Sequence, residues 1–379
     1  MRRIAEPFSF RKLHLAHRLI MAPMTTSRAR PDGGPTPWSL AHYRERVRGG
    51  ASLLITEATY VTQAGKGYQD QLGVHRDSLI PDLASLVSAI HEAGAPFALQ
   101  LFHGGRTCYP DISGEEVVAP SPLPHPGSYA TPRELTVPEI EKIVQEFGEA
   151  AARARKAGFD AVEIHGATWY ICQQFYSPVS NLRKDAYGGS RERRMRFPLE
   201  VARAVRKGAG PEVVVGYRMV PKEPWEGGIT IEDSVELARA LVEAGVDWLH
   251  ISRNGRVGAP VKPEEYVEGF RAIRRAVPVA MIANGGVFKP EDAGALLDLG
   301  ADLVALGRSI LADPHFPRKA LEGRESYTCI QCKPCTFMRD SRCPEEVYKG
   351  KKPPELQDLW AIEGALEPTG YVPLPTRVR

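Results

Sequence analysis

The sequence of 379 residues has no early apolar run long enough to cross a bilayer. Its opening stretch, MRRIAEPFSFRKLHLAHRL, also lacks the continuous hydrophobic segment of a secretory signal. The formal net charge is only +3, which gives no reason to expect nucleic acid or an acidic membrane as the main partner. We therefore expect a cytoplasmic protein that acts on a small-molecule substrate, without a nucleic-acid or membrane partner.

The chain has no GxGxxG motif after its first strand candidate, which argues against an open Rossmann-like sheet. In four places a helix that ends on Ala-Gly or Leu-Gly is followed at once by an apolar strand. These places are EAGAPFALQLFHG (92–104), KAGFDAVEIHG (156–166), EAGVDWLHIS (243–252) and DLGADLVALGR (298–308). Glycine supplies the left-handed helix end, and a strand buried on both faces needs little polar alternation.

Four further buried-strand candidates lie at 19–22, 53–56, 213–217 and 279–283, which brings the total to eight. Helical patterns separate most of them, and Thr136 with Glu139 and Thr230 with Asp233 have the spacing of capping boxes at helix starts. Eight strands alternating with helices at this length predict a closed (β/α)8 TIM barrel. We expect one barrel over 1–328 and a separate segment over 329–379.

Two segments depart from the repeat. Residues 109–138 are rich in proline, glycine and serine, which predicts a long loop after the third strand. The tail from 344 to 379 is also rich in proline, and we expect it to wrap the barrel or to meet a neighbouring subunit of a homo-oligomer.

Barrel enzymes place catalytic groups at the carboxyl ends of their strands. The residues at those positions here are Thr25, Ala58, Gln100, His165, Arg218, Ser252, Asn284, Gly285, Gly286, Gly307 and Arg308. Glycine pairs with an arginine at the last two strands suit a phosphate, although one such pair alone is more typical of a tight turn. A phosphate site fits aldolases, isomerases and flavin enzymes, so the residues leave the chemistry open. We identify no lysine after a strand in a Schiff-base position, which disfavours an aldolase.

The run HGATWYICQQFYSPVSNLRKDAYGGSRERRMRF, from His165 to Phe197, narrows the choice. It resembles the signature of the Old Yellow Enzyme family, whose SPxxNxRxDxYGGS segment is matched at every fixed position by Ser177 to Ser190. APMT, TEAT, QLFHGGR, YRMVP, NGG and LGRSILADP follow the family's order along the chain. The resemblance covers about residues 5 to 335, essentially the whole barrel.

That resemblance implies bound FMN and NAD(P)H as the reductant. Gly286, Gly307 and Arg308 would hold the FMN phosphate, while Pro23, Thr25, Ala58, Gln100 and Arg218 would line the flavin ring. Met24, His165, Asn284 and Gly285 complete the implied cofactor-binding set.

The resemblance also implies reduction of an electron-poor C=C bond. His165 would donate a hydrogen bond to the substrate carbonyl, Tyr170 would donate the proton, and Thr168 would be the second carbonyl donor. Thr168 stands where relatives usually carry histidine or asparagine, and Trp169 stands where a small residue is common. A flavoprotein that acts only as a redox sensor remains an alternative, supported mainly by Thr168.

CIQCKPC places Cys329, Cys332 and Cys335 at the spacing of ligands to a 4Fe–4S cluster, with Cys343 as a fourth ligand. Iron–sulfur relatives of the family, such as trimethylamine dehydrogenase and dienoyl-CoA reductase, carry their cluster at this place. A structural zinc or unliganded thiols are the alternatives. A cluster would make an electron-carrier protein a partner and a non-enone substrate possible.

Overall fold

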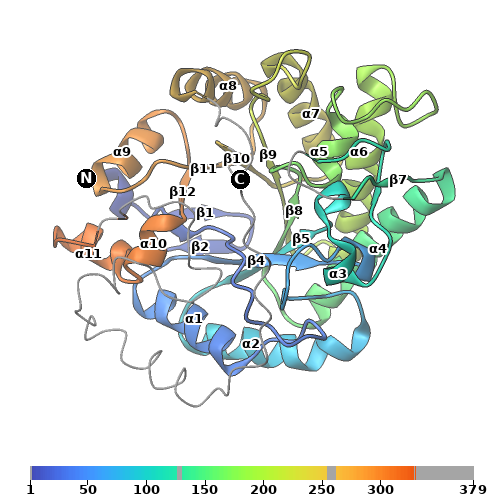
Figure 1. Ribbon diagram of the computed structural model, residues 1–379. Helices are drawn as coiled ribbons and strands as arrows, with labels where there is room; N and C mark the ends of the chain where they lie inside the picture. Colours follow the sequence, from blue (N-terminus) through green and yellow to red (C-terminus); the bar gives the residue numbers. More distant parts are fainter. Residues whose placement is uncertain (1, 126–129, 254–261, 328, 330–379) are drawn as a thin grey trace, which may run out of the picture.

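The computed structural model describes residues 2–125, 130–253, 262–327 and 329, and eight of its strands close into a parallel barrel (Figure 1). The barrel strands are β3 (Leu19–Met21), β4 (Leu54–Tyr60), β5 (Phe97–Phe102), β8 (Ala161–His165), β9 (Val214–Met219), β10 (Trp248–Ser252), β11 (Ala280–Asn284) and β12 (Leu303–Leu306). They neighbour one another in chain order, and β12 pairs with β3 to close the ring. The predicted TIM barrel is confirmed.

A ring of helices surrounds the strands (Figure 1). The main helices are α1 (Pro37–Arg48), α2 (Ile80–Glu92), α4 (Val137–Lys156), α6 (Arg191–Ala209), α7 (Ile231–Glu243), α8 (Pro263–Ala276), α9 (Pro290–Asp298) and α11 (Phe316–Glu322). Shorter helices are α3 (Pro110–Ser113), α5 (Ile171–Tyr176) and α10 (Arg308–Ala312). Among the described residues, no helix is both long enough and apolar enough to cross a membrane.

The predicted helix ends are confirmed at the level of single dihedral angles. Gly94, Gly158, Gly245 and Gly300, which close the four expected helices, have φ angles of 101°, 92°, 95° and 112°. These left-handed values are disfavoured for residues with a Cβ atom. The capping box at Thr230 is also present, since its backbone N–H donates to the Asp233 carboxylate at 2.9 Å and its hydroxyl accepts from the Asp233 backbone at 3.1 Å.

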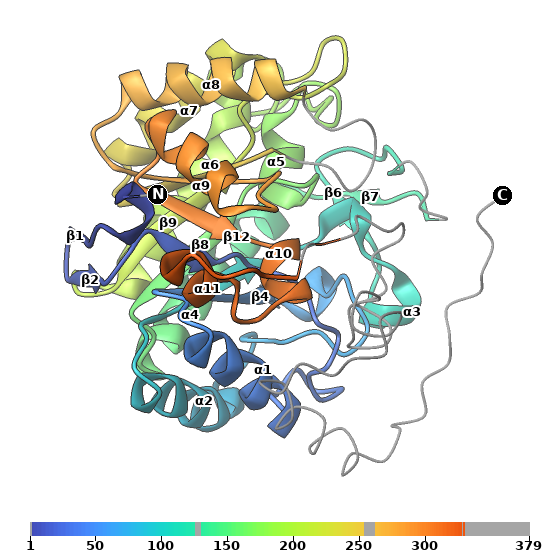
Figure 2. The same ribbon diagram turned by 90° about the vertical axis from the view of Figure 1, so that its left-hand side faces the viewer.

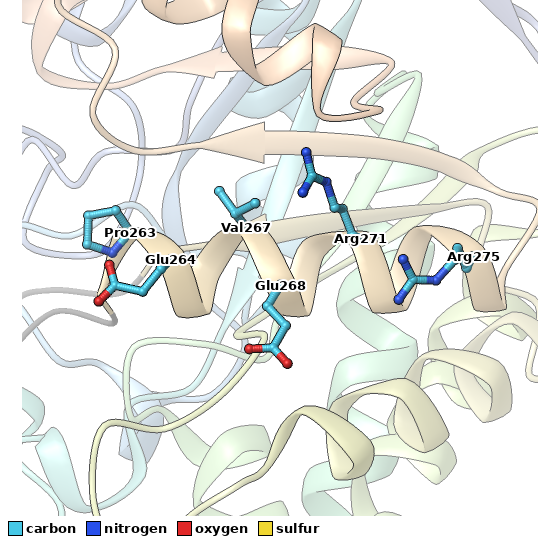
Figure 3. Close-up of a pocket in the computed structure, with 6 residues that line it drawn as sticks. All are labelled: Pro263, Glu264, Val267, Glu268, Arg271 and Arg275. Atoms are coloured by element: carbon cyan, nitrogen blue, oxygen red, sulfur yellow. The ribbon is translucent and has the colours of Figure 1, made fainter.

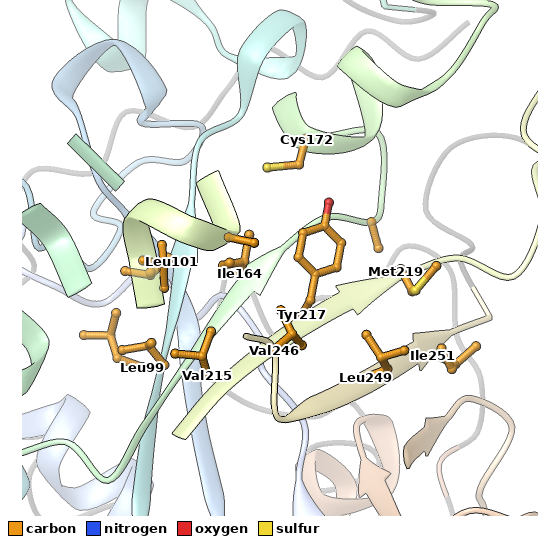
Figure 4. Packing of buried hydrophobic residues seen from close by; sticks show 14 of the residues in the cluster. Leu99, Leu101, Ile164, Cys172, Val215, Tyr217, Met219, Val246, Leu249 and Ile251 are labelled. Carbon is orange, nitrogen blue, oxygen red and sulfur yellow. The ribbon is translucent and has the colours of Figure 1, made fainter. Parts of the chain in front are cut away.

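Successive side chains of each strand point alternately into the barrel interior and toward the surrounding helices. Leu99, Tyr217 and Leu249 belong to the large apolar cluster between strands and helices, shown in Figure 4. The intervening residues point the other way, because successive side chains of a strand lie on opposite faces. Gln100, Arg218 and His250 are therefore interior residues, although the strands that carry them are mostly apolar.

An N-terminal hairpin, which the sequence did not predict, closes the far end of the barrel. Strands β1 (Phe8–Phe10) and β2 (Leu13–Leu15) pair antiparallel, and Leu13 and Leu15 pack with interior residues such as Trp248. Figure 2 shows this hairpin at one end of the barrel and α3, β6 (Val118–Ala119) and β7 (Arg133–Glu134) at the other. The mouth at the carboxyl ends of the strands is thus left as the face for chemistry.

The segment 109–138 differs in part from the long loop that was predicted. It contains α3 and a two-stranded parallel ladder in which β6 pairs with β7. Residues 126–129 and the tail from 330 onward, with the expected tail contacts, lie outside the described residues.

Candidate active site at the barrel mouth

The strand register brings four of the expected site residues together. His165, the last residue of β8, pairs with Arg218 of β9, and Ser252 of β10 pairs with Asn284 of β11. Nη2 of Arg218 also donates to the hydroxyl of Ser252 at 3.1 Å. These four residues therefore lie side by side on four consecutive strands at the mouth.

Other expected site residues lie on the remaining strands of the barrel. Ala58 pairs with Gln100, and a register shift in β4 between Ile55 and Ala58 sets this pairing. On the opposite side, Gly307 follows β12, and a Cβ atom added to it would lie 3.8 Å from Sδ of Met24. The expected flavin and phosphate residues thus occupy one continuous rim.

His165 is 5% exposed and holds a defined tautomer. Its Nδ1 accepts the backbone N–H of Ala167 at 3.3 Å, so the ring proton of the neutral imidazole lies on Nε2. Burial, followed by the charges of Arg218 and His250, lowers the pKa of His165 well below its ordinary value. At neutral pH the ring is therefore uncharged, and its Nε2–H is a hydrogen-bond donor.

Tyr170 lies against His165, with ring centroids 4.6 Å apart and planes at 85°. It is 7% exposed and also packs edge-on against Phe102 at 4.4 Å. Its hydroxyl oxygen lies 2.5 Å from the hydroxyl oxygen of Tyr68, a residue that the sequence did not single out. The mouth therefore contains a pair of phenols, one buried and one half-buried, beside a neutral imidazole.

Two buried glutamines fasten the loops that carry these tyrosines. Gln71 donates to the carbonyl of Ala58 at 2.7 Å and accepts the backbone N–H of Tyr68 at 3.2 Å. Gln174 donates to the carbonyl of Gly104 at 2.9 Å and accepts the backbone N–H of Arg106 at 3.1 Å. Both loops are thus tied to the ends of barrel strands, which restrains the two phenols.

Thr168 and Trp169 connect His165 to Tyr170 through an unusual backbone. Their φ angles are 58° and 67°, a left-handed conformation that is uncommon for a tryptophan and rarer for a β-branched threonine. Trp169 stacks on Trp225 with centroids 4.6 Å apart, and its backbone N–H donates to Gln173 at 2.9 Å. Thr168 is half-buried beside the catalytic pair that the resemblance implies.

The segment from Ser177 to Ser190, which carries the family resemblance, has a structural role. Asn181 donates to the carbonyls of Phe175 and Tyr187 at 2.6 and 2.7 Å. Arg183 pairs with Asp185 and also donates to the carbonyl of Leu135 at 2.6 Å. The motif that carries the resemblance therefore clamps the loop after β8.

The mouth fits a planar ligand that carries an anionic group. Within the part of the chain that the structure describes, Nε of Arg218 and Nε2 of His250 are buried without a hydrogen-bond partner. Gly285 and Gly286 have φ angles of 106° and 77°, which turn the backbone sharply after β11. Buried polar atoms without a protein partner and a glycine turn are what a bound flavin and its phosphate would need.

Of the four cysteines expected to bind a metal or cluster, Cys329 lies within the described residues. Cys329 is buried against Ala312 and Phe288. Cys332, Cys335 and Cys343, the other three ligands of the expected metal or iron–sulfur site, lie outside the described residues. Among the described residues, no group of three or more histidine, cysteine or acidic side chains is placed to hold a metal ion.

A hollow of about 530 Å³ lies elsewhere, along the outer face of α8 (Figure 3). Its lining includes Glu264, Val267 and Arg271, all from one helix of the outer ring. It contains none of the strand-end residues, so it is not the site that the sequence predicted.

Comparisons with known proteins agree with this architecture. The model of the NADH:flavin oxidoreductase / NADH oxidase family matches residues 3–326. NADH oxidase of Thermoanaerobacter brockii is 40% identical over 84% of this chain, and the probable NADH-dependent flavin oxidoreductase YqiG of Bacillus subtilis is 39% identical over 84%. The match spans 51% of the first relative and 88% of the second, so the chain covers about half the length of the NADH oxidase.

Solved structures are similar over nearly the same extent. Morphinone reductase superposes with a TM-score of 0.78 at 34% identity, covering 88% of this chain and 92% of that one. An Old Yellow Enzyme homologue from Zymomonas mobilis gives a TM-score of 0.77 at 28% identity, covering 86% of this chain and 95% of that one. The family resemblance read from the sequence is thereby confirmed.

Proposed function

The chain belongs to the NADH:flavin oxidoreductase / NADH oxidase family, that of the Old Yellow Enzymes, and from this we propose that it is an FMN-dependent NAD(P)H oxidoreductase that reduces an electron-poor C=C bond. The observation that carries the proposal is the pairing of a neutral Nε2–H donor on His165 with the buried hydroxyl of Tyr170 at one mouth. A structure of morphinone reductase in complex with tetrahydroNAD supports a nicotinamide as the reductant.

The residues of the mouth have distinct proposed tasks. FMN, when bound, supplies a hydride to the β-carbon of the alkene and is reduced again by NAD(P)H. His165, together with Thr168, donates hydrogen bonds to the substrate carbonyl and stabilises the negative charge that develops on its oxygen. Tyr170 delivers a proton to the α-carbon, so that one hydride and one proton account for the two hydrogen atoms gained.

Further rim residues would hold the cofactor. Arg218, whose Nε is buried without a partner among the described residues, would stabilise the anionic reduced ring. Gly286, Gly307 and Arg308 would bind the phosphate, and Pro23, Met24, Thr25, Ala58, Gln100, Asn284 and Gly285 would surround the rest of the cofactor. A neutral His165 suits this arrangement, because it adds a donor to the mouth without adding a second positive charge.

The test separates the two half-reactions. Purified enzyme with bound FMN should be reduced by NADH or NADPH and reoxidised by cyclohexenone-like substrates. Tyr170→Phe should slow reoxidation by the alkene by about 100-fold or more, the usual weight of a general acid, and should leave flavin reduction near the wild-type rate. Equal slowing of both half-reactions would reject Tyr170 as the proton donor.

A second candidate function rests on the cysteine spacing of Cys329, Cys332, Cys335 and Cys343. An iron–sulfur flavoprotein would exchange electrons with a separate carrier protein and act on a non-enone substrate. Iron and acid-labile sulfide in anaerobically purified protein would support it, whereas zinc alone would leave the cysteines a structural role. The visible spectrum distinguishes the cases, since flavin and iron–sulfur absorb and zinc does not.

A further inference from the structure

We propose that Glu163, buried beneath the mouth, is a positioning residue that fixes the amide of Gln100 and offsets the charge of Arg218, and so lowers the reduction potential of the bound flavin. The inference rests on the proposed binding of FMN. It assigns a role to a carboxylate that lies two positions before His165 on β8 and is hydrogen-bonded to Gln100.

Glu163 is the middle residue of β8, is 0% exposed, and lies two positions before His165. One carboxylate oxygen accepts Nε2–H of Gln100 at 2.8 Å. The other accepts Nε1–H of Trp248 at 3.1 Å and lies 3.0 Å from Nδ1 of His250. The carboxylate is thus surrounded by donors from β5 and β10, as a fully buried charge requires.

The first consequence concerns the direction of the Gln100 amide. A carboxylate can only accept, so its contact with Gln100 must involve the amide nitrogen. The carbonyl oxygen of Gln100 is then the atom left to accept a hydrogen bond from another group. Glu163 therefore presents Gln100 as an acceptor, which suits an N–H on the edge of a flavin ring.

The second consequence concerns the charges of Glu163 and His250. Burial would raise the pKa of Glu163, but the hydrogen bond from His250, the charge of Arg218 and the hydrogen bond from Gln100 outweigh burial and hold it below the ordinary value. Burial lowers the pKa of His250 in the same cluster. At neutral pH the pair is therefore a carboxylate with a neutral imidazole, and its single negative charge faces the positive charge of Arg218.

Arg218 stands at the rim, where an anionic reduced flavin would gain from its positive charge. A negative charge near Arg218 weakens this stabilisation of the reduced flavin. Glu163 would therefore make the flavin harder to reduce, and a stronger hydride donor once it is reduced. Glu163 orients Gln100 through their hydrogen bond, and its negative charge acts on the ring through space, without direct contact.

The experiment measures the midpoint potential of FMN in holoenzyme variants by equilibration with reference dyes. Glu163→Gln removes the charge with little change in size, and the reduced-to-oxidised ratio at a fixed potential should rise about tenfold, equivalent to ~30 mV for a two-electron couple. Glu163→Asp keeps the charge and should restore a potential close to wild type. A wild-type potential in Glu163→Gln would overturn the proposal.

Glu45 offers a matched control, because it is also a buried glutamate bonded to a histidine. Its carboxylate lies 2.7 Å from Nε2 of His315, on the outer side of the barrel between α1 and the segment before α11. Glu45→Gln should leave the flavin potential unchanged. A shift as large as that of Glu163→Gln would show that loss of any buried glutamate acts through the fold, and would overturn the specific role.

If Glu163→Gln alone does not fold, because Arg218 is left without its counter-charge, a double variant answers the same question. The potential of Arg218→Gln with Glu163→Gln should lie above that of Arg218→Gln alone by a similar factor. Equal potentials would overturn the proposal. A protein that binds no FMN at all would instead refute the proposed function, so the two failures are distinguishable.

Discussion

The hydroxyl oxygens of Tyr68 and Tyr170 lie 2.5 Å apart, although the two residues are separated by 102 positions in the chain. Tyr68 comes from the loop after β4 and is half-buried, whereas Tyr170 opens α5 and is nearly inaccessible. A phenol that gives up its proton inside a buried mouth needs a route by which that proton is replaced. Tyr68 is placed to hold the Tyr170 hydroxyl in one direction and to pass a proton to it.

We therefore expect Tyr68→Phe to slow reoxidation of the flavin by an alkene about tenfold, a part of the usual contribution of general acid catalysis. Reduction of the flavin by NAD(P)H, which does not use this proton, should stay at the wild-type rate. Stopped-flow absorbance of the flavin measures both steps. Tyr60→Phe is the control, because Tyr60 packs in the same cluster but its hydroxyl has no hydrogen-bond partner among the described residues. Tyr60→Phe should leave both rates unchanged, and an equal loss in both variants would contradict the role of Tyr68.

The left-handed backbone at Thr168 leads to a second prediction. Asparagine tolerates φ near 58° better than a β-branched residue does, so Thr168→Asn should raise the free energy of unfolding by about 1 kcal/mol. Asparagine also carries a longer donor, so reduction of cyclohexenone should become faster. Urea unfolding and alkene-dependent flavin reoxidation measure the two effects.

Thr168→Val is the matched comparison, because it keeps the branched Cβ and removes only the hydroxyl. It should retain the backbone strain and lose alkene reactivity. If Thr168→Val reacts as fast as wild type, the hydroxyl of Thr168 is not a carbonyl donor.

Buried histidines predict a dependence of stability on pH. Burial lowers the pKa of His103 to about 3, against about 6.5 for an ordinary histidine. Between these values the unfolded chain binds a proton that the folded chain does not, so the free energy of unfolding falls as pH is lowered below 6.5. The loss from this one residue approaches 1.4 kcal/mol per pH unit.

Urea unfolding of wild type and His103→Gln at pH 7.5 and pH 5.5 measures this loss. His42 and His165, which are buried, and the half-buried His75 have pKa values shifted in the same direction and contribute to both proteins, so the difference in slope isolates His103. His14→Gln, which replaces the exposed residue of strand β2, should keep the wild-type slope. An unchanged slope in His103→Gln would contradict the assignment of a neutral, buried ring.

The barrel strands could be predicted because strands buried on both faces appear as short apolar runs after helix-ending glycines. The second strand was placed at 53–56, whereas β4 continues to Tyr60. The reason is the register shift between Ile55 and Ala58, which lets the strand continue past the polar pair Thr56 and Glu57. The N-terminal hairpin was missed because three-residue strands carry too few positions to show a period.

The strand-end residues could be predicted from position alone, but their partners could not. The sequence alone indicates that hydrogen-bond donors surround Glu163, because a carboxylate in the middle of the buried strand AVEIH requires them. Only the register, which sets Gln100 opposite Glu163, identifies one of those donors. The contact between Tyr68 and Tyr170 depends on two loops whose paths no local pattern determines.

The turn after β11 provides a final prediction with a close internal control. Gly285 has a φ of +106°, and a Cβ atom added to it would lie 2.9 Å from Cβ of Arg253, closer than side chains tolerate. Gly94, at the end of α2, has a φ of +101°, and no atom of the described residues lies within 4 Å of an added Cβ. Alanine at either position must strain the backbone by about 1–2 kcal/mol, so Gly285→Ala and Gly94→Ala should both lose at least that much unfolding free energy.

Only Gly285→Ala also displaces Arg253 and the glycine turn at the expected phosphate site. We therefore expect the dissociation constant of FMN, measured by fluorescence quenching on reconstitution, to rise more than tenfold in Gly285→Ala and to stay near wild type in Gly94→Ala. If both variants bind FMN as wild type does, the turn after β11 does not hold the phosphate. If both lose FMN equally, affinity follows global stability, and the glycine turn has no specific part in binding.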